Sequence, residues 1–156
     1  MVEQKIKAVP HRLTLIYKSE PLYFVTFNTM FRKPLLANEN VMTAFCDYAR
    51  KGVGYNVGVG CFVLMPDHIH LFVRITGEIT LSSWIKGLKH CLGAVIRDGY
   101  QDKMVWQPGF FDHVMRSDEG YMEKWAYVRM NPVRKGLVGK PEDWPYQGEI
   151  VSIDRA

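Results

Sequence analysis

The stretch MPDHIHLF, residues 65–72, carries two histidines one residue apart in an otherwise apolar segment. HIHLFVRI, residues 68–75, is typical of a strand because it is rich in β-branched and aromatic side chains. Side chains alternate along a strand, so His68 and His70 are expected on one face, roughly 7 Å apart along the chain. Two imidazoles at that spacing can bind one metal ion about 2 Å from each nitrogen. The alternative is a half-exposed strand whose outer face simply carries polar side chains.

The segments around this strand predict an α+β fold. A strand at 57–66 precedes it, and Pro66 and Asp67 then form the turn of a hairpin. Further strands are predicted at 22–28 and 110–117, and helices at about 38–51, 81–98 and 119–131. The order β-α-β-β-α-β-α begins as the split βαβ, or ferredoxin-like, pattern, in which an antiparallel sheet has helices on one face. The last helix, capped by Asp118 and ended by Pro132, is expected near the other face, and an extended tail should follow it.

Length and composition predict a single domain over residues 1–156. The formal net charge of +4 is compatible with nucleic acid as a partner. The three cysteines are odd in number and form no CxxC pair, which favours buried thiols in a reducing, cytoplasmic location. No apolar run reaches the roughly 18 residues of a membrane span, and the N-terminus lacks the apolar stretch of a secretory signal, so no membrane partner is expected.

The predicted last helix supplies candidates for a third metal ligand and for a nucleophile. Tyr127 and Asn131 are four residues apart, so they should share one face of this helix. An asparagine carbonyl oxygen is a suitable ligand for Mg²⁺ or Mn²⁺, and it could complete a site with His68 and His70 if the helix crosses the sheet. Tyr127 would then lie beside the metal, where a phenol can attack a phosphodiester and form a phosphotyrosine. The alternative for Tyr127 is a core aromatic on an amphipathic helix.

Four motifs together resemble a known family. MPDHIHLF resembles the His-hydrophobic-His (HUH) motif of the single-tyrosine transposases, which act on single-stranded DNA. YVRMNPVRKGLV followed by KPEDWPYQ resembles the catalytic helix and tail of their REP-associated relatives. VWQPGFFDHVMRSDEGY is similar to the segment before that helix, and WIKGLKH resembles the lysine-containing helix after the HUH strand. The likeness runs from about Tyr23 to Tyr146, which is most of the chain.

The resemblance implies specific roles for residues in these motifs. It implies a catalytic tyrosine at Tyr127, metal ligands at His68, His70 and Asn131, and Mg²⁺ or Mn²⁺ as the cofactor. Insertion-sequence members commonly have a glutamine where Asn131 stands, so the asparagine favours the REP-associated branch, which is thought to cut palindromic repeat elements. The implied partner is single-stranded or hairpin DNA. Both a monomer and a homodimer are compatible with the family.

Basic and aromatic residues elsewhere could contact DNA. Lys89 and Arg116 are candidates for neutralising phosphates, and Trp106 or Phe110 could stack on unpaired bases. The alternative is a solvated basic face over core aromatics.

The sequence therefore predicts a transposase-like DNA endonuclease and strand transferase that acts through a 5′-phosphotyrosine intermediate. Two alternatives stay open. One is a metal-dependent nuclease in which water attacks the phosphate, and the other is a non-catalytic nucleic-acid-binding module of the same fold.

Overall fold

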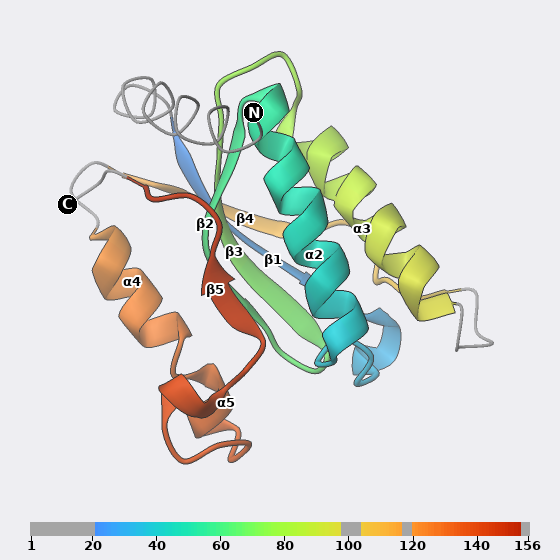
Figure 1. The fold of residues 1–156 in the computed structure, drawn as a ribbon, viewed down its shortest axis with the longest axis vertical. Helices are drawn as coiled ribbons and strands as arrows, with labels where there is room; N and C mark the ends of the chain where they lie inside the picture. Colours follow the sequence, from blue (N-terminus) through green and yellow to red (C-terminus); the bar gives the residue numbers. More distant parts are fainter. Residues whose placement is uncertain (1–20, 98–103, 117–119, 154–156) are drawn as a thin grey trace, which may run out of the picture.

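The computed structural model describes residues 21–97, 104–116 and 120–153 (Figure 1). Its strands are β1 (Leu22–Asn28), β2 (Val57–Leu64), β3 (His68–Ile75), β4 (Phe111–Met115) and β5 (Gln147–Glu149). Its α-helices are α2 (Glu39–Gly52), α3 (Leu81–Arg97), α4 (Tyr121–Val128) and α5 (Asn131–Arg134). Three short 3₁₀ helices are η1 (Met30–Arg32), η2 (Val53–Tyr55) and η3 (Pro141–Asp143).

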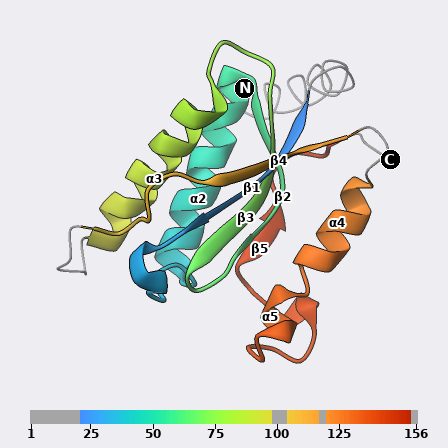
Figure 2. The ribbon, with the colours of Figure 1, turned by 180° about the vertical axis from the view of Figure 1, so that it is seen from behind.

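The five strands form one antiparallel sheet in the order β4-β1-β3-β2-β5. The first six major elements follow the predicted β-α-β-β-α-β order, so the α+β, ferredoxin-like expectation is confirmed. Helices α2 and α3 cover one face, and α4 and α5 lie on the other, as opposite views of the ribbon show (Figures 1 and 2). None of the described helices is long and apolar enough to cross a membrane.

The main core lies between the sheet and helices α2 and α3. Ile69, Leu71 and Val73, which alternate with the two histidines along β3, are fully buried in it. Burial of each such side chain stabilises the fold by about 1.5–3 kcal/mol. Because alternate residues of a strand face opposite ways, the same packing turns His68 and His70 toward the α4 side.

Helix α4 attaches to the second face through three side chains at helical spacing. Tyr121 is buried against an apolar cluster that includes Phe72 of β3, and Val128 is buried in a second cluster with Met65. Trp125, between them, packs against both clusters. Residues at i, i+4 and i+7 share one helix face, so the pattern fixes α4 along the sheet.

The predicted last helix differs from the observed one. Asp118, its predicted cap, lies outside the described residues, and α4 is preceded by Gly120, which makes no side-chain capping bond. Helix α4 ends at Val128, and a turn leads into the separate helix α5. Pro132 stands in the first turn of α5 and does not end a helix. The N–H groups of a first turn have no acceptor within the helix, so the missing N–H of proline costs no hydrogen bond there.

The expected extended tail is an ordered part of the sheet. Strand β5 pairs with the edge of β2, and the Leu64 N–H donates to the Tyr146 carbonyl over 2.8 Å. The indole Nε1 of Trp144 also donates to the Leu64 carbonyl, at 3.0 Å. This three-residue strand has too little alternation to predict from sequence, and it exists because β2 offers an unpaired edge.

Candidate active site

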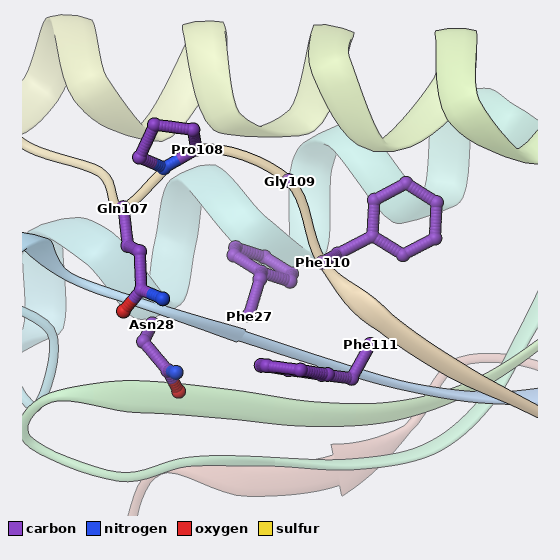
Figure 3. A pocket seen from close by; sticks show the side chains of 7 residues that line it. All are labelled: Phe27, Asn28, Gln107, Pro108, Gly109, Phe110 and Phe111. Atoms are coloured by element: carbon purple, nitrogen blue, oxygen red, sulfur yellow. The ribbon is translucent and has the colours of Figure 1, made fainter.

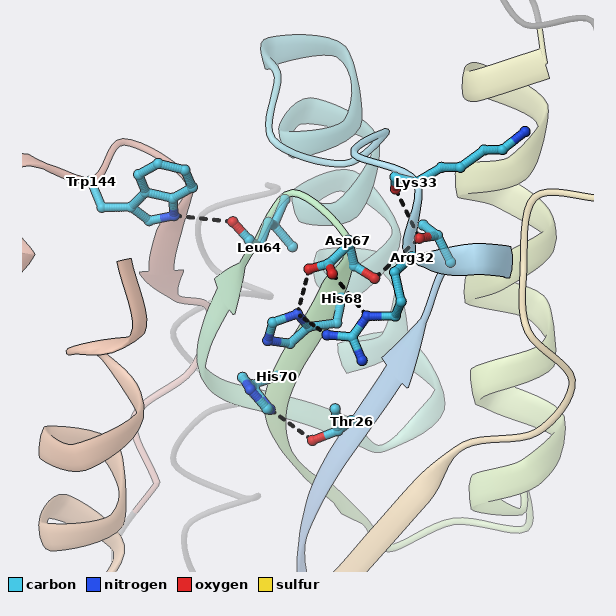
Figure 4. Close-up of polar contacts among 9 residues, drawn as sticks. Thr26, Arg32, Lys33, Leu64, Asp67, His68, His70 and Trp144 are labelled. Carbon is cyan, nitrogen blue, oxygen red and sulfur yellow. Dashed lines mark hydrogen bonds and ion pairs between the residues drawn. The ribbon is translucent and has the colours of Figure 1, made fainter. Parts of the chain in front are cut away.

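The two histidines lie side by side on the α4 side of the sheet (Figure 4). His68 pairs with Asn28 and His70 pairs with Thr26 across the β1–β3 ladder, so both rings emerge near the start of the central strand. Their ring centroids are 4.7 Å apart and the rings are nearly perpendicular. This separation leaves both imidazoles within reach of one metal ion, given metal–nitrogen distances of about 2 Å.

One nitrogen of each ring is already engaged. His68 Nδ1 lies 2.8 Å from Asp67 Oδ1, and His70 Nδ1 lies 2.7 Å from the hydroxyl of Thr26. An ionised carboxylate only accepts hydrogen bonds, so Nδ1 of His68 carries the proton and Nε2 keeps its lone pair. The same tautomer of His70 follows if its Nδ1–H donates to Thr26. Outer partners of this kind are what orient metal-binding imidazoles.

Burial keeps both imidazoles neutral. Desolvation lowers the pKa of His70 to about 3, and the positive charges of Lys124 and Arg134 add to the effect. The pKa of His68 is also lowered, chiefly by burial, although its bond to Asp67 opposes the shift. Neutral imidazole is the form that binds metal, so these histidines are ready to ligate at neutral pH.

Arg32 joins the site from an unusual backbone turn. Phe31 and Arg32 have φ angles of 56° and 55°, in the left-handed region that non-glycine residues rarely adopt. The turn brings Arg32 Nε to 2.8 Å from Asp67 Oδ2. Burial would raise the pKa of Asp67, but hydrogen bonds from Arg32 and His68 outweigh it and hold the pKa below its usual value. Asp67 is therefore an ionised bridge between Arg32 and His68.

Tyr127 and Asn131 lie on different helices, contrary to the single helix predicted. Tyr127 is 66% exposed at the end of α4, and the guanidinium of Arg134 stacks over its ring at 4.2 Å. Asn131 begins α5, and its Oδ1 accepts a short hydrogen bond from the same arginine. The charges of Arg134 and Lys135 lower the pKa values of His70 and His68 respectively, so α5 lies near the histidine pair.

Tyr121, the other tyrosine of α4, has a structural environment. Its ring packs edge-on against Phe72, and its hydroxyl accepts a 2.7 Å hydrogen bond from the backbone N–H of Cys61. Burial raises its pKa, so a phenolate at this position is strongly disfavoured. Of the two tyrosines on α4, Tyr127 is exposed and Tyr121 is buried.

The donor set fits a divalent cation with open coordination positions. Within the described ranges, no group of three or more His, Cys, Asp or Glu side chains is arranged to hold a metal. Two neutral imidazoles therefore need an amide oxygen such as that of Asn131, or ligands from substrate and water, to complete the coordination. Such an incomplete protein shell is typical of a catalytic metal site, which keeps positions free for substrate.

Known proteins resemble this chain in sequence and in fold. The family model "Transposase IS200 like" matches residues 19–128. The chain belongs to the IS200-like transposase family. A REP-associated tyrosine transposase of Escherichia coli (strain K12) is 29% identical over 93 residues, which are 56% of this chain and 52% of that protein. The matched region thus spans about half the length of that relative.

Two further relatives cover more of this IS200-like chain. A protein of Haemophilus influenzae (strain ATCC 51907 / DSM 11121 / KW20 / Rd), whose name assigns it provisionally to the REP-associated tyrosine transposases, is 25% identical over 136 residues. That match covers 80% of this chain and 77% of the relative. The solved structure of a REP-associated tyrosine transposase bound to a REP hairpin superposes with a TM-score of 0.66 at 22% identity, covering 88% of this chain and 91% of that one. The predicted resemblance and fold are therefore confirmed.

Lys89 of this IS200-like chain lies on α3, which covers the face opposite the histidines. Its ammonium donates to the carbonyls of Gln107 and Gly109, each at 2.9 Å, and so holds the loop before β4. Trp106, a predicted stacking residue, packs on Phe27 and donates its Nε1 to the Lys89 carbonyl. These contacts give both residues a local structural role, and their contact with DNA stays a prediction.

The remaining predicted DNA contacts fall at the β4 edge. Arg116 follows β4 directly and is exposed, and its contact with phosphate stays a prediction. Phe110 is partly buried against the main core, whereas the next residue, Phe111, is 65% exposed. Phe110 was a predicted stacking residue, but Phe111 is the exposed member of the pair. Two adjacent aromatic residues in a strand do not reveal from sequence which of them faces solvent.

Proposed function

We propose that this protein is a DNA nicking and joining enzyme that acts on single-stranded or hairpin DNA through a covalent tyrosine intermediate. The observation that carries the proposal is the pair of neutral imidazoles, buried His68 and half-buried His70, each held at Nδ1 on the face covered by α4, the helix that carries Tyr127. The relative whose structure contains a REP hairpin supports hairpin DNA as the substrate class. A DNA substrate also implies a cytoplasmic location, and monomeric and homodimeric assemblies both accommodate the proposal.

A divalent cation, Mg²⁺ or Mn²⁺, would be held by His68, His70 and Asn131. When bound, it would polarise a non-bridging oxygen of the scissile phosphate and stabilise the charge that develops there. The chain's own contribution is to keep the imidazoles neutral and oriented through Asp67 and Thr26.

Basic side chains around the pair would hold the DNA backbone. Arg32, Lys124, Arg134 and Lys135 come from three separate elements, yet their charges all act on the histidines. Phosphates attract such clustered cations, and the release of counterions makes the affinity depend steeply on salt. The site would therefore draw a phosphodiester toward Tyr127.

The proposed reaction transfers a phosphoryl bond from DNA to protein. The Tyr127 hydroxyl oxygen attacks phosphorus, the bond from phosphorus to the 3′-oxygen breaks, and the phenolic proton is lost. The departing 3′-oxygen takes up a proton and becomes a free 3′-hydroxyl, while the 5′-phosphate stays on Tyr127. Because the phosphoester bond is retained, a later 3′-hydroxyl can reverse the step and rejoin DNA.

A hairpin oligonucleotide with a flanking single strand tests this proposal. One set is labelled at the 3′ end and the other at the 5′ end, and each is incubated with protein and Mg²⁺. A slowly migrating covalent band is expected only with the 3′ label and only with metal. Metal-dependent cleavage without such a band would support the water-using nuclease, and binding without cleavage would support the non-catalytic module.

Asn131→Ala is expected to weaken Mn²⁺ binding and cleavage by about 10- to 100-fold, the range seen when a metal site loses supporting contacts. Asn131 stands at the start of a four-residue helix, and among the described residues its side chain bonds Arg134 alone, so the fold should persist. Mn²⁺ titration measures the effect, with the exposed Asn40→Ala as the matched control. Unchanged affinity in a folded Asn131→Ala protein would leave Asn131 with a structural role alone.

Thr26→Val tests the outer support of His70. Valine has nearly the shape of threonine but cannot accept the Nδ1–H, so the imidazole loses its fixed tautomer and orientation. We expect Mn²⁺ affinity to fall by about 10- to 100-fold with little change in the unfolding temperature. The exposed Thr43→Val on α2 is the control. Equal affinity in both variants would contradict a role for this hydrogen bond.

A further inference from the structure

A small pocket opens between the end of β1 and the loop that enters β4 (Figure 3). Its cavity volume is about 140 Å³. The pocket is small beside typical small-molecule sites of roughly 300–1,000 Å³, so it suits one ring better than a whole nucleotide. The lining residues are Phe27, Asn28, Gln107, Pro108, Gly109, Phe110 and Phe111.

The pocket adjoins the candidate active site through the sheet register. Asn28 lies directly opposite His68, and Phe111 lies opposite Thr26, the hydrogen-bond partner of His70. Residues directly opposite in an antiparallel ladder point to the same face. The side chains of Asn28 and Phe111 therefore emerge on the face that carries the histidines.

Two amide side chains in this pocket have no assigned partner. Across residues 21–97, 104–116 and 120–153, neither the Asn28 nor the Gln107 side chain makes a hydrogen bond. Figure 3 shows both amides on the same side of the pocket, below the loop. A carboxamide presents one donor and one acceptor side by side, and this pair matches the edge of a base such as adenine.

An exposed aromatic ring stands next to the amides. Phe111 is 65% exposed on β4, an edge strand, while Phe110 turns to the opposite side and packs on the core (Figure 3). Its exposed ring offers a flat apolar face to a ligand at this edge of the sheet. Stacking of an unpaired base on such a ring is a common mode of single-strand recognition.

The loop that forms the pocket is fixed before any ligand arrives. Lys89 Nζ donates to the carbonyls of Gln107 and Gly109, and the Gln107 N–H donates to the Asn28 carbonyl at 3.0 Å. Gly109 adopts a φ of 79°, which a residue with a side chain would rarely take. These contacts hold the two amide-bearing residues together, so little ordering is needed when a ligand binds.

We infer that this pocket binds one unpaired nucleobase next to the phosphate that the histidine site handles, with Phe111 stacking on it and Asn28 and Gln107 reading its edge. The inference rests on the proposed function, which puts single-stranded DNA on this face. The amide chemistry favours adenine, whose neighbouring amino group and ring nitrogen complement a carboxamide. The pocket thus selects which base may lie beside the cleavage point.

Binding of short oligonucleotides tests the inference without metal or cleavage. Fluorescently labelled oligo(dA) and oligo(dT) of about eight nucleotides fall within the usual single-strand site sizes. We expect wild type to prefer oligo(dA). Phe111→Ala should weaken oligo(dA) binding by about 5- to 150-fold, the change that corresponds to the loss of one stacked base. Tyr55→Ala, at the other end of the sheet and 64% exposed, should bind as wild type does.

The amides have a separate readout. Asn28→Ala and Gln107→Ala should reduce the preference for oligo(dA) over oligo(dT), whereas the exposed Asn40→Ala should keep it. An oligonucleotide with 2-aminopurine in place of adenine should lose fluorescence on binding wild type but not Phe111→Ala, since stacking quenches it. Equal binding of both oligonucleotides by wild type, or unchanged binding by folded pocket variants, would overturn the inference.

The adduct assay separates this inference from the proposed function. If the covalent band forms while oligonucleotide binding is the same for both bases and in every folded pocket variant, the nicking activity stands and the base pocket is refuted. If no band forms but oligo(dA) binding depends on Phe111 and both amides, the base pocket stands and the nicking activity is refuted.

Discussion

Tyr127→Phe is expected to abolish the covalent protein–DNA adduct while fold and DNA binding persist. The change removes one hydroxyl oxygen, and that oxygen is the proposed nucleophile. The ring is 66% exposed, and the Arg134 guanidinium stacks on its face and not on its hydroxyl, so packing should be unaffected. A 3′-labelled hairpin with Mg²⁺ should give a covalent band with wild type and none with the variant, and gel-shift affinity should be unchanged.

Two tyrosines serve as controls for this result. Tyr55 is 64% exposed, nearly the same as Tyr127, so Tyr55→Phe should form the adduct at the wild-type rate. Tyr121→Phe should also form it, but with lower stability, because it leaves the buried N–H of Cys61 without its acceptor. An unsatisfied buried donor costs about 1–3 kcal/mol. An adduct in Tyr127→Phe would mean that another residue is the nucleophile.

His70→Ala is expected to lower metal-dependent cleavage by more than about 100-fold, since even the loss of an outer-shell partner costs 10- to 100-fold. The half-buried imidazole is neutral and held by Thr26, so the variant loses a nitrogen lone pair that is available to bind the ion. Mn²⁺ titration and cleavage of a labelled hairpin measure the loss, and His68→Ala should behave alike. His90→Ala, exposed on α3, is the matched control.

A loss of cleavage in His70→Ala could come from the missing ligand or from unfolding, and the two causes must be distinguished. His70 stacks on Phe24 with centroids 5.4 Å apart, so its removal also leaves a small cavity. Thermal unfolding and gel-shift affinity show whether the fold and DNA binding survive. A folded His70→Ala protein that binds Mn²⁺ and cleaves like wild type would remove the metal site from the proposal.

Much of the candidate site follows from local sequence. Strand parity alone placed His68 and His70 on one face, because the period of two is a property of the extended backbone. The same alternation placed Ile69 in the core. The order of strands and helices could also be predicted, because apolar residues recur at different spacings in long strands and long helices.

The partners of the histidines could not be predicted in this way. Arg32 reaches Asp67 only because two successive residues adopt left-handed φ angles, and Thr26 meets His70 only because β1 pairs with β3 in one register. Both contacts join residues at least 35 positions apart. Local pattern contains no information about such distances, which are set by packing of the whole sheet.

The sequence by itself determined the fold class, the shared face of the two histidines and the resemblance to a transposase family. Only the tertiary structure decided that Tyr127 is exposed while Tyr121 is buried, and that Asn131 starts a helix of its own. Only it brought Phe111 and the amide side chains of Asn28 and Gln107 to one pocket. The physical reason is that backbone period acts between near neighbours, whereas burial, pKa and the grouping of side chains depend on which distant segments pack together.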